Sequence, residues 1–266
     1  MTFAAVALGA PLAALALGFF WLHRRSPRHA HWPILASCAA VTVAAWAAAW
    51  QLYAGAPAVD QTLWRWSWAG GMGVDFGIRL DGVGAAVLAM VSLVGALIHA
   101  YAVGYMREDP GFSRFFLYFH LFLFAMIGLL LSNNYLQLYV FWEGVGLASY
   151  LLIGFWHDRE SARKAALKAF IVNRIGDACF LFAIFLLLRA AGTVRFTELF
   201  ARLDMIDSGS LGAAALLLFL GASAKSAQFP LYVWLPDAME GPTPTSALMH
   251  AATMVTAGVF LMIRSW

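Results

Sequence analysis

The chain has 266 residues, of which 62% are hydrophobic and only 12% are charged. So few charged side chains cannot cover the surface of a soluble globule, so lipid must replace water around most of the chain. The formal net charge of +3 is too small and too scattered for binding to nucleic acid. The two cysteines, Cys38 and Cys179, lie far apart in apolar runs, which excludes a disulfide framework and a Cys-x-x-Cys motif.

Eight apolar runs are long enough to cross a bilayer as helices. A helix rises about 1.5 Å per residue, so ~20 apolar residues span a hydrocarbon core of ~30 Å. The sequence therefore predicts an all-α fold, a polytopic membrane bundle of about eight transmembrane helices. The runs cover residues 3–21, 32–53, 81–105, 114–132, 134–156, 168–188, 211–229 and 246–263.

Basic residues gather in the connections on one side of the predicted membrane. This side lies opposite the N-terminus, which predicts a cytoplasmic location for it and an outer, periplasmic location for the N-terminus. The basic residues on the predicted cytoplasmic side are Arg24, Arg25, Arg28, Arg107, Arg114, Arg159, Arg163, Lys164 and Lys168, and those opposite are mainly Arg65, Arg79, Arg195 and Arg202.

The longest connection, residues 55–80, has a different pattern. Aromatic and polar residues alternate from Leu63 up to the pair Gly70 and Gly71. Alternation followed by a turn signal predicts a β-hairpin, and its tryptophans are typical of a membrane interface. We expect an interfacial hairpin in this loop.

Four ionisable residues fall inside the apolar runs: Glu143, Arg174, Asp177 and Lys225. Glu143 comes nine residues after Asn134, so helical rise places it ~14 Å deep, near the middle of the membrane. A carboxylate there costs several kcal/mol unless it is paired or protonated. A protonated glutamate with one structural hydrogen bond is the alternative to a functional site. Arg174 and Asp177 can pair with each other at i,i+3, and for them a packing role and a functional role are equally open.

Lys225 lies in an apolar stretch, residues 211–235, that is too long for one span and that Pro230 must interrupt. The seventh helix is therefore predicted to break near Pro230, and such breaks mark ion sites in transporters. We expect Lys225 to pair with Glu143 as a proton site whose affinity depends on their separation. A lysine that snorkels to the surface is the alternative, and apolar helix on both sides of Lys225 argues against it.

Three histidines also fall in the apolar runs. His250 lies almost two turns into the eighth helix, which should begin with Thr243 as N-cap and Pro244 at the first helical position. An ordinary histidine pKa of ~6.5 suits proton exchange, so His250 is a candidate relay beside the helix of Lys225, with a packing residue as the alternative. His99 and His120 offer two haem ligands at arbitrary depths, which does not support a haem site.

Three segments resemble the antiporter-like subunits of NADH-quinone oxidoreductase (respiratory complex I), most of all those of the subunit L (chain 5) type. The longest, residues 221–258, reads GASAKSAQFPLYVWLPDAMEGPTPTSALMHAATMVTAG and contains Lys225 and His250. Residues 141–156 resemble the glutamate helix of that family, and residues 168–177 resemble the helix after it. The likeness runs nearly end to end.

The resemblance implies a role for each matched residue. Glu143 and Lys225 would be the mid-membrane ion pair of a proton half-channel, His250 the next relay group, and Asp177, beside Arg174, a further acid near the side where protons enter. The same resemblance implies no cofactor in this chain, with NADH, FMN, iron-sulfur clusters and quinone in partner subunits. The partners would be other membrane subunits, above all neighbouring antiporter-like ones, in the inner (plasma) membrane of a bacterium.

The resemblance also predicts the domain organisation. Residues 1–110 would hold the first three helices and the hairpin, and residues 111–266 an antiporter-like proton-channel unit of helices four to eight. Family members continue through a second, inverted copy of that unit, so we expect this chain to be the N-terminal half, as a fragment or as half of a split protein.

We therefore expect a proton-translocating membrane subunit of a redox-driven NADH-quinone oxidoreductase. The alternatives are a related subunit of a cation/proton antiporter, of a membrane hydrogenase or of an inorganic-carbon uptake complex, and an inactive structural fragment. The sequence does not decide between protons and sodium ions as the transported species.

Overall fold

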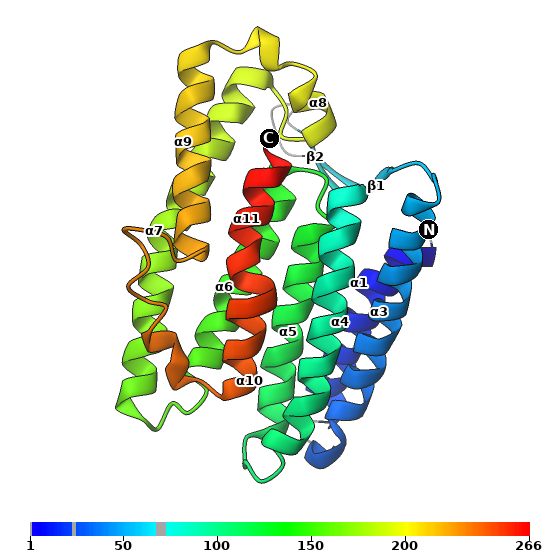
Figure 1. Ribbon diagram of the computed structural model, residues 1–266, viewed down its shortest axis with the longest axis vertical. Coiled ribbons are helices and arrows are strands. Elements are labelled where there is room, and N and C mark those ends of the chain that lie inside the picture. Colours follow the sequence, from blue (N-terminus) through cyan, green and yellow to red (C-terminus); the bar gives the residue numbers. More distant parts are fainter. Residues whose placement is uncertain (1, 23–24, 68–72) are drawn as a thin grey trace.

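The computed structural model describes residues 2–22, 25–67 and 73–266, and it shows the predicted all-α bundle (Figure 1). In these residues seven helices are long and apolar enough to cross a membrane, and a shorter apolar helix covers Val6–Phe20. Each of the eight predicted runs thus contains a helix. The helices are α1 (Thr2–Leu17, continued by the π-turn η1, Gly18–Leu22), α3 (His31–Tyr53), α4 (Gly82–Tyr105), α5 (Phe112–Leu130), α6 (Tyr135–Ile153), α7 (Glu160–Ala191), α8 (Phe196–Phe200), α9 (Ser208–Lys225), α10 (Thr243–Ser246), the π-segment η5 (Ala247–Thr253) and α11 (Met254–Arg264), with short 3-10 turns at Pro27–His29, Leu203–Met205 and Asp237–Glu240.

Helix α5 lies at the centre of the bundle, and its composition explains why. Within its apolar window 78% of the residues are buried, against 28% for α3. Its phenylalanines Phe115, Phe119 and Phe122 are completely buried, whereas Trp46 and Trp50 of α3 remain more than half exposed. Aromatic side chains bury the largest apolar area, so they fill the core, and the exposed tryptophans face the lipid.

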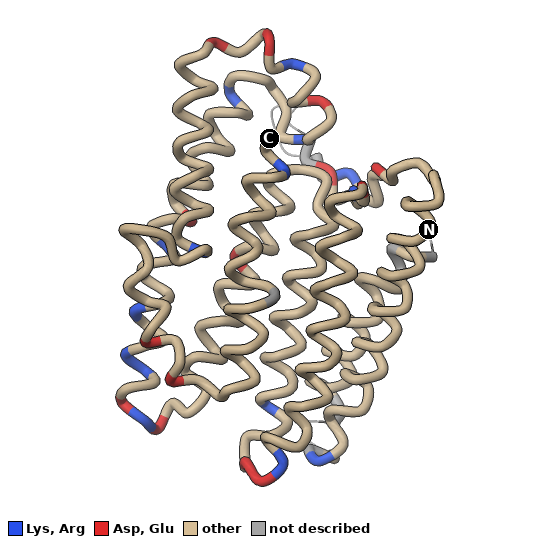
Figure 2. The backbone as a smooth tube through the Cα atoms, in the orientation of Figure 1, with Lys and Arg blue, Asp and Glu red and all other residues tan. Residues whose placement is uncertain are grey.

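Charged residues gather at the two ends of the bundle, and few lie between them (Figure 2). This distribution is expected for a chain in a bilayer, where a charge in the hydrocarbon region is costly. The four ionisable residues predicted inside the membrane are described with the site below.

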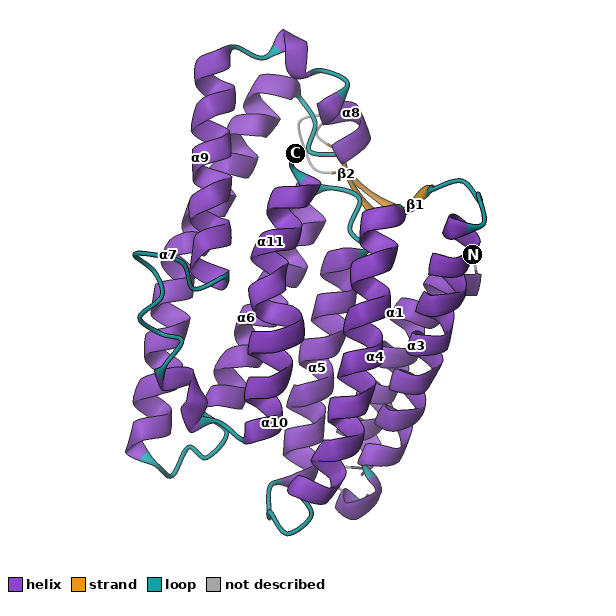
Figure 3. Ribbon diagram, in the orientation of Figure 1, coloured by secondary structure: helices purple, strands orange, loops and turns teal. Residues whose placement is uncertain are grey.

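The seventh helix breaks differently from the prediction. Helix α9 ends at Lys225, and residues 226–236 form turns instead of a second apolar half-helix (Figure 3). Pro230 has no N–H to continue the helix, and the carbonyl of Ala224, next to the end of α9, accepts a hydrogen bond from Nε1 of Trp234 at 3.0 Å. The returning segment therefore caps the end of α9 with a side chain.

The eighth helix is also interrupted. Its N-cap is Pro242 and not Thr243, so α10 starts one residue earlier than predicted. The chain then widens into η5 before it resumes as α11. The hydroxyl of Thr253 donates to the carbonyl of Leu248 at 2.6 Å, which satisfies a backbone group where the α-helical pattern is lost.

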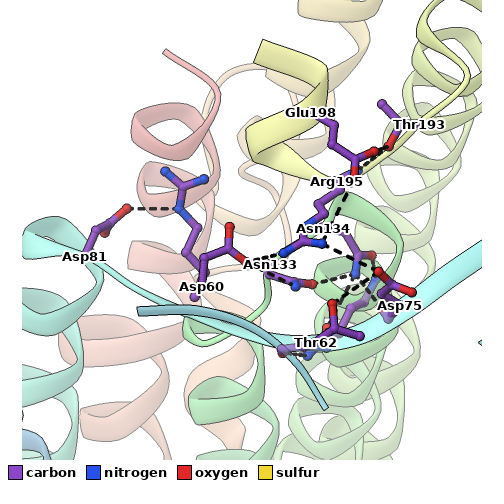
Figure 4. Close-up of polar contacts among 12 residues, drawn as sticks. Asp60, Thr62, Asp75, Asp81, Asn133, Asn134, Thr193, Arg195 and Glu198 are labelled. Carbon is purple, nitrogen blue, oxygen red and sulfur yellow. Dashed lines mark hydrogen bonds and ion pairs between the residues drawn. The ribbon is translucent and has the colours of Figure 1, made fainter. Parts of the chain in front are cut away.

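The segment predicted as a hairpin contains two antiparallel strands, β1 (Val59–Ser67) and β2 (Gly73–Leu80). Its turn, residues 68–72, lies outside the described residues. The strands meet the N-terminus of α6 in a polar cluster (Figure 4), where Asn134 donates to the carbonyl of Asp75 at 2.6 Å and Arg195 contacts Asp60 at 2.9 Å. These contacts fix the hairpin over one end of the bundle.

Asp81 joins the ends of α4 and α11. It caps α4 by accepting from the N–H of Gly84 at 3.0 Å, and it forms an ion pair with Arg264, the last residue of α11. Burial alone would raise the pKa of Asp81, but the Arg264 guanidinium, the Gly84 N–H and the Arg79 guanidinium lower it from 3.8 to about 2. Because the folded protein binds this proton less readily than the unfolded chain, the ionised form stabilises the fold above pH ~4.

We predict that Asp81→Asn lowers the unfolding free energy by roughly 2 kcal/mol at pH 7, since asparagine keeps the cap but loses the charge. The difference from the wild type should disappear as the pH falls from about 4 to about 2. Chemical unfolding in mixed micelles measures both effects. Asp207→Asn, at the exposed N-cap of α9, is the matched control, and an equal loss in both variants would refute the role of the ion pair.

Candidate functional site

Lys225, the last residue of α9, is completely buried. Its Nζ lies 3.9 Å from Oδ1 of Asp177 on α7, whose side chain is 3% exposed. Helix α9 packs along α7, so the two charges meet where α9 breaks off. This buried ion pair is the centre of the candidate site.

Helix α6 encloses the pair on another side. Nε1 of Trp142 donates to Oδ1 of Asp177 at 2.6 Å, and the Trp142 ring centroid lies 5.6 Å from Nζ of Lys225. At Gly146 a Cβ atom would lie 2.8 Å from that Nζ. Helix α6 therefore supplies a hydrogen-bond donor to the acid, an aromatic face to the ammonium and, at Gly146, the space that the ammonium occupies.

Glu143 and Arg174 form a second ion pair beside the first. It is less buried, with side-chain exposures of 22% for Glu143 and 45% for Arg174. The charges of both residues also act on Asp177 and on Lys225. The cluster contains two acids and two bases, so it is formally neutral when all four side chains are ionised, and a low-dielectric region favours such neutrality.

The partners in these pairs differ from the expected ones. The sequence pairs Glu143 with Lys225, but within the described part of the chain Glu143 pairs with Arg174, and Lys225 with Asp177. The reason is that α7 packs against both α6 and α9. Arg174 therefore meets Glu143 of α6, whereas Asp177, one turn further along α7, lies between Trp142 of α6 and Lys225 of α9. The snorkelling alternative is wrong, because Lys225 has no exposed surface.

His250 lies in the π-segment η5, and its side chain is partly buried. Its ring centroid is 5.9 Å from that of Trp234, the residue that caps α9. Among the described residues neither ring nitrogen has a hydrogen-bond partner. Widened helical turns of this kind are common at functional sites, and this one places an uncommitted histidine next to the segment that follows Lys225.

Three residues of the site, Trp142, Gly146 and Trp234, are not predicted from the sequence. All three act through the Lys225–Asp177 pair or the end of α9. A signal for the first two is their position on the helix of Glu143, one residue before it and three after it. In an apolar helix, however, a tryptophan and a glycine are most simply read as packing residues.

Family comparison identifies the fold and its class. Residues 132–266, just over half of the chain, match the family described as "NADH:quinone oxidoreductase/Mrp antiporter, TM". The chain belongs to this family. Residues 66–116 match the family described as "NADH-Ubiquinone oxidoreductase (complex I), chain 5 N-terminus". With its seven candidate spans, the chain is a multi-pass antiporter-like membrane protein.

Curated relatives carry the names of NADH-quinone oxidoreductase subunits. The chain is 54% identical to NADH-quinone oxidoreductase subunit L of Mycobacterium tuberculosis over 208 residues, which are 78% of this chain and 33% of the relative. It is 47% identical to NAD(P)H-quinone oxidoreductase chain 5 of Synechocystis sp. over 239 residues, which are 88% of this chain and 35% of the relative. The chain thus spans about a third of the length of these relatives.

Two solved structures share the fold. The Mrp complex from Dietzia sp. contains a chain that superposes with a TM-score of 0.83 at 29% identity, covering 98% of this chain and 28% of that one. A chain of the membrane-bound sulfane sulfur reductase, an archaeal respiratory membrane complex, superposes with a TM-score of 0.85 and covers 98% of this chain and 52% of that one. At 21% identity this second likeness concerns the fold alone.

A double-mutant cycle distinguishes the two possible partners of Lys225. Lys225→Met leaves Asp177 buried without its counter-charge, so we predict a loss of ~3 kcal/mol in the unfolding free energy. The coupling between Lys225→Met and Asp177→Asn should exceed ~1 kcal/mol and should be larger than that between Lys225→Met and Glu143→Gln. Unfolding in mixed micelles measures these couplings. Equal couplings would show that Lys225 does not prefer Asp177.

Proposed function

We propose that this chain is a proton-translocating membrane subunit of a redox-driven NADH-quinone oxidoreductase. The observation that supports this most strongly is the completely buried Lys225, paired with Asp177 where α9 breaks. An ionisable group at this depth is costly for stability alone. Its presence is explained if the lysine takes up and releases a proton.

The proposed step is a change in the distance between Lys225 and Asp177. At 3.9 Å and an effective dielectric constant of ~20, two unit charges interact by about 4 kcal/mol. Moving one charge through ~180 mV requires a similar free energy. Separation of the pair therefore alters the proton affinity of Lys225 on the scale that a membrane pump needs.

Glu143 and Arg174 would couple the pair to a neighbouring subunit. Arg174 is 45% exposed, so a charge that arrives from outside the chain can attract or repel it without entering the core. Arg174 lies one turn from Asp177 on α7. Displacement of Arg174 would change the electrostatic field at Asp177. It would thereby change the electrostatic attraction between Asp177 and Lys225.

His250 would accept the proton that leaves Lys225. Trp234 contacts both the end of α9 and the His250 ring. A conformational change in residues 226–236 would therefore shift Lys225 and His250 together. In this proposal the chain itself binds no redox cofactor, and NADH, FMN, iron-sulfur clusters and quinone belong to partner subunits. Residues 111–266 would form the channel unit, and the basic end of the bundle would face the cytoplasm of a bacterium.

Proton pumping by membrane vesicles that contain the intact complex tests the proposal. We predict that Lys225→Met and Asp177→Asn each reduce NADH-driven acidification, read from dye quenching, at least threefold, because the buried proton site is lost. NADH oxidation with ferricyanide, which bypasses the membrane arm, should persist, and native electrophoresis should show the variant subunit in a complex of unchanged size. Full acidification in both variants would exclude Lys225 from the proton path.

Gly146→Ala provides a finer test, because it moves the ammonium without removing it. The new methyl group would lie 2.8 Å from Nζ of Lys225, the free end of a flexible side chain. We predict a pumping rate reduced at least twofold with a melting temperature close to that of the wild type. Gly212→Ala in α9, where a Cβ atom meets nothing within 4 Å, is the control. The same rate in both variants would contradict the proposed position of the ammonium.

A cation/proton antiporter subunit is the second candidate function. The likeness to the Mrp complex, at 29% identity over 98% of this chain, favours it. The same buried pair would then exchange protons against Na⁺. Vesicles in which an imposed Na⁺ gradient, without NADH, drives proton movement that depends on Lys225 would support this candidate over the first.

A further inference from the structure

Cys38, His99 and His120 form a buried cluster outside the charged site, here named the Cys-His-His cluster. They come from α3, α4 and α5, and their exposures are 1%, 0% and 0%. Sγ of Cys38 lies 3.8 Å from Nδ1 of His120, and the two imidazole centroids are 5.6 Å apart. One donor atom from each residue lies within 4.8 Å of the other two.

The three residues share one depth in the bundle, so the expectation of arbitrary depths for the two histidines is wrong. Cys38 follows the first residue of α3 by seven positions, His99 precedes the last residue of α4 by six, and His120 follows the first residue of α5 by eight. At about 1.5 Å per residue, each lies roughly 10 Å inside the same end of the bundle. Three separate helices thus bring thiol and imidazole groups to one point.

The hydrogen bond of His99 prepares its other nitrogen for a ligand. Nδ1 of His99 lies 2.7 Å from the carbonyl oxygen of Gly95. A carbonyl only accepts, so Nδ1 carries the proton and Nε2 keeps a free lone pair. Within the described chain this buried Nε2 has no hydrogen-bond partner. A backbone carbonyl that orients one ring nitrogen while the other is free is the usual arrangement of a metal-binding histidine.

We propose that the Cys-His-His cluster binds one Cu⁺ ion. Thiolate and imidazole are ligands that Cu⁺ and Zn²⁺ both accept, so charge and coordination number decide between the two ions. Cu⁺ with one thiolate and two neutral imidazoles has no net charge, whereas Zn²⁺ with the same ligands keeps one positive charge. A net charge in this buried position is costly.

Coordination number supports the same ion. Among the His, Cys, Asp and Glu residues that the structure describes, this group offers three ligands. Three ligands satisfy Cu⁺, whereas Zn²⁺ takes four and would need a water as the fourth ligand at this fully buried position. Binding replaces the thiol proton of Cys38 by Cu⁺ and releases one proton, so the charge of the site does not change. The ion would link α3, α4 and α5 at one level.

Copper binding to the full chain, purified in detergent under reducing and anaerobic conditions, tests this proposal. With bathocuproine disulfonate as competitor, the wild type should hold one Cu⁺ per chain, and X-ray absorption should report one sulfur and two nitrogen neighbours. Cys38→Ser and His99→Gln should each weaken binding by more than ~100-fold. Cys179→Ser, which removes the other cysteine, from α7, should bind like the wild type.

Several results would overturn the proposal. Equal copper retention in Cys38→Ser and Cys179→Ser would place the ion elsewhere, and tighter binding of Zn²⁺ than of Cu⁺ in a parallel titration would refute the choice of metal. A further test uses the wild type alone and measures its melting temperature with and without Cu⁺. An ion that binds only the folded state raises the melting temperature. A melting temperature that does not respond to free Cu⁺ would also contradict the site.

Discussion

The contact between the ammonium of Lys225 and the carboxylate of Asp177 is the constraint on which the rest of the site depends. Two opposite charges are removed from water where an apolar helix stops, and neither tolerates burial without the other. The indole of Trp142 and the absence of a side chain at Gly146 make the arrangement possible. The break in α9 matters as well, because the segment that returns after Lys225 brings Trp234 to the end of α9 and to the His250 ring.

The backbone around the charged site is irregular. Helix α9 stops at Lys225, and the π-segment η5 interrupts the last helix. Irregular backbone at membrane depth is tolerated only where protein or water satisfies its polar groups. These two irregularities lie at Lys225 and at His250, the groups that exchange protons in the proposed function.

The sequence is sufficient to predict the bundle and most of the site residues, but not their pairing. Run lengths locate every spanning helix, because the bilayer imposes a length on each of them. Charges within apolar runs locate Glu143 and Lys225 for the same energetic reason. Which acid meets Lys225 depends on the rotation of α7 between two neighbours, and helical spacing alone does not contain that rotation.

The common depth of the Cys-His-His cluster can be predicted from the sequence, but the conformation after Lys225 cannot. The common depth of Cys38, His99 and His120 follows once each is counted from the same end of the bundle. The turns after Lys225 do not follow from Pro230 alone, because proline ends a helix but does not specify what comes next. There the tertiary contact between Trp234 and Ala224 decides the conformation.

The protonation state of Lys225 itself provides the most direct measurement. Nitrogen NMR of the chain with ¹⁵N-labelled lysine, assigned by comparison with Lys225→Met, separates an ammonium from a neutral amine. We predict a charged Lys225 at pH 7 in the wild type and a smaller charged fraction in Asp177→Asn, with less effect from Glu143→Gln. An unchanged resonance in Asp177→Asn would contradict the claim that this acid controls the lysine.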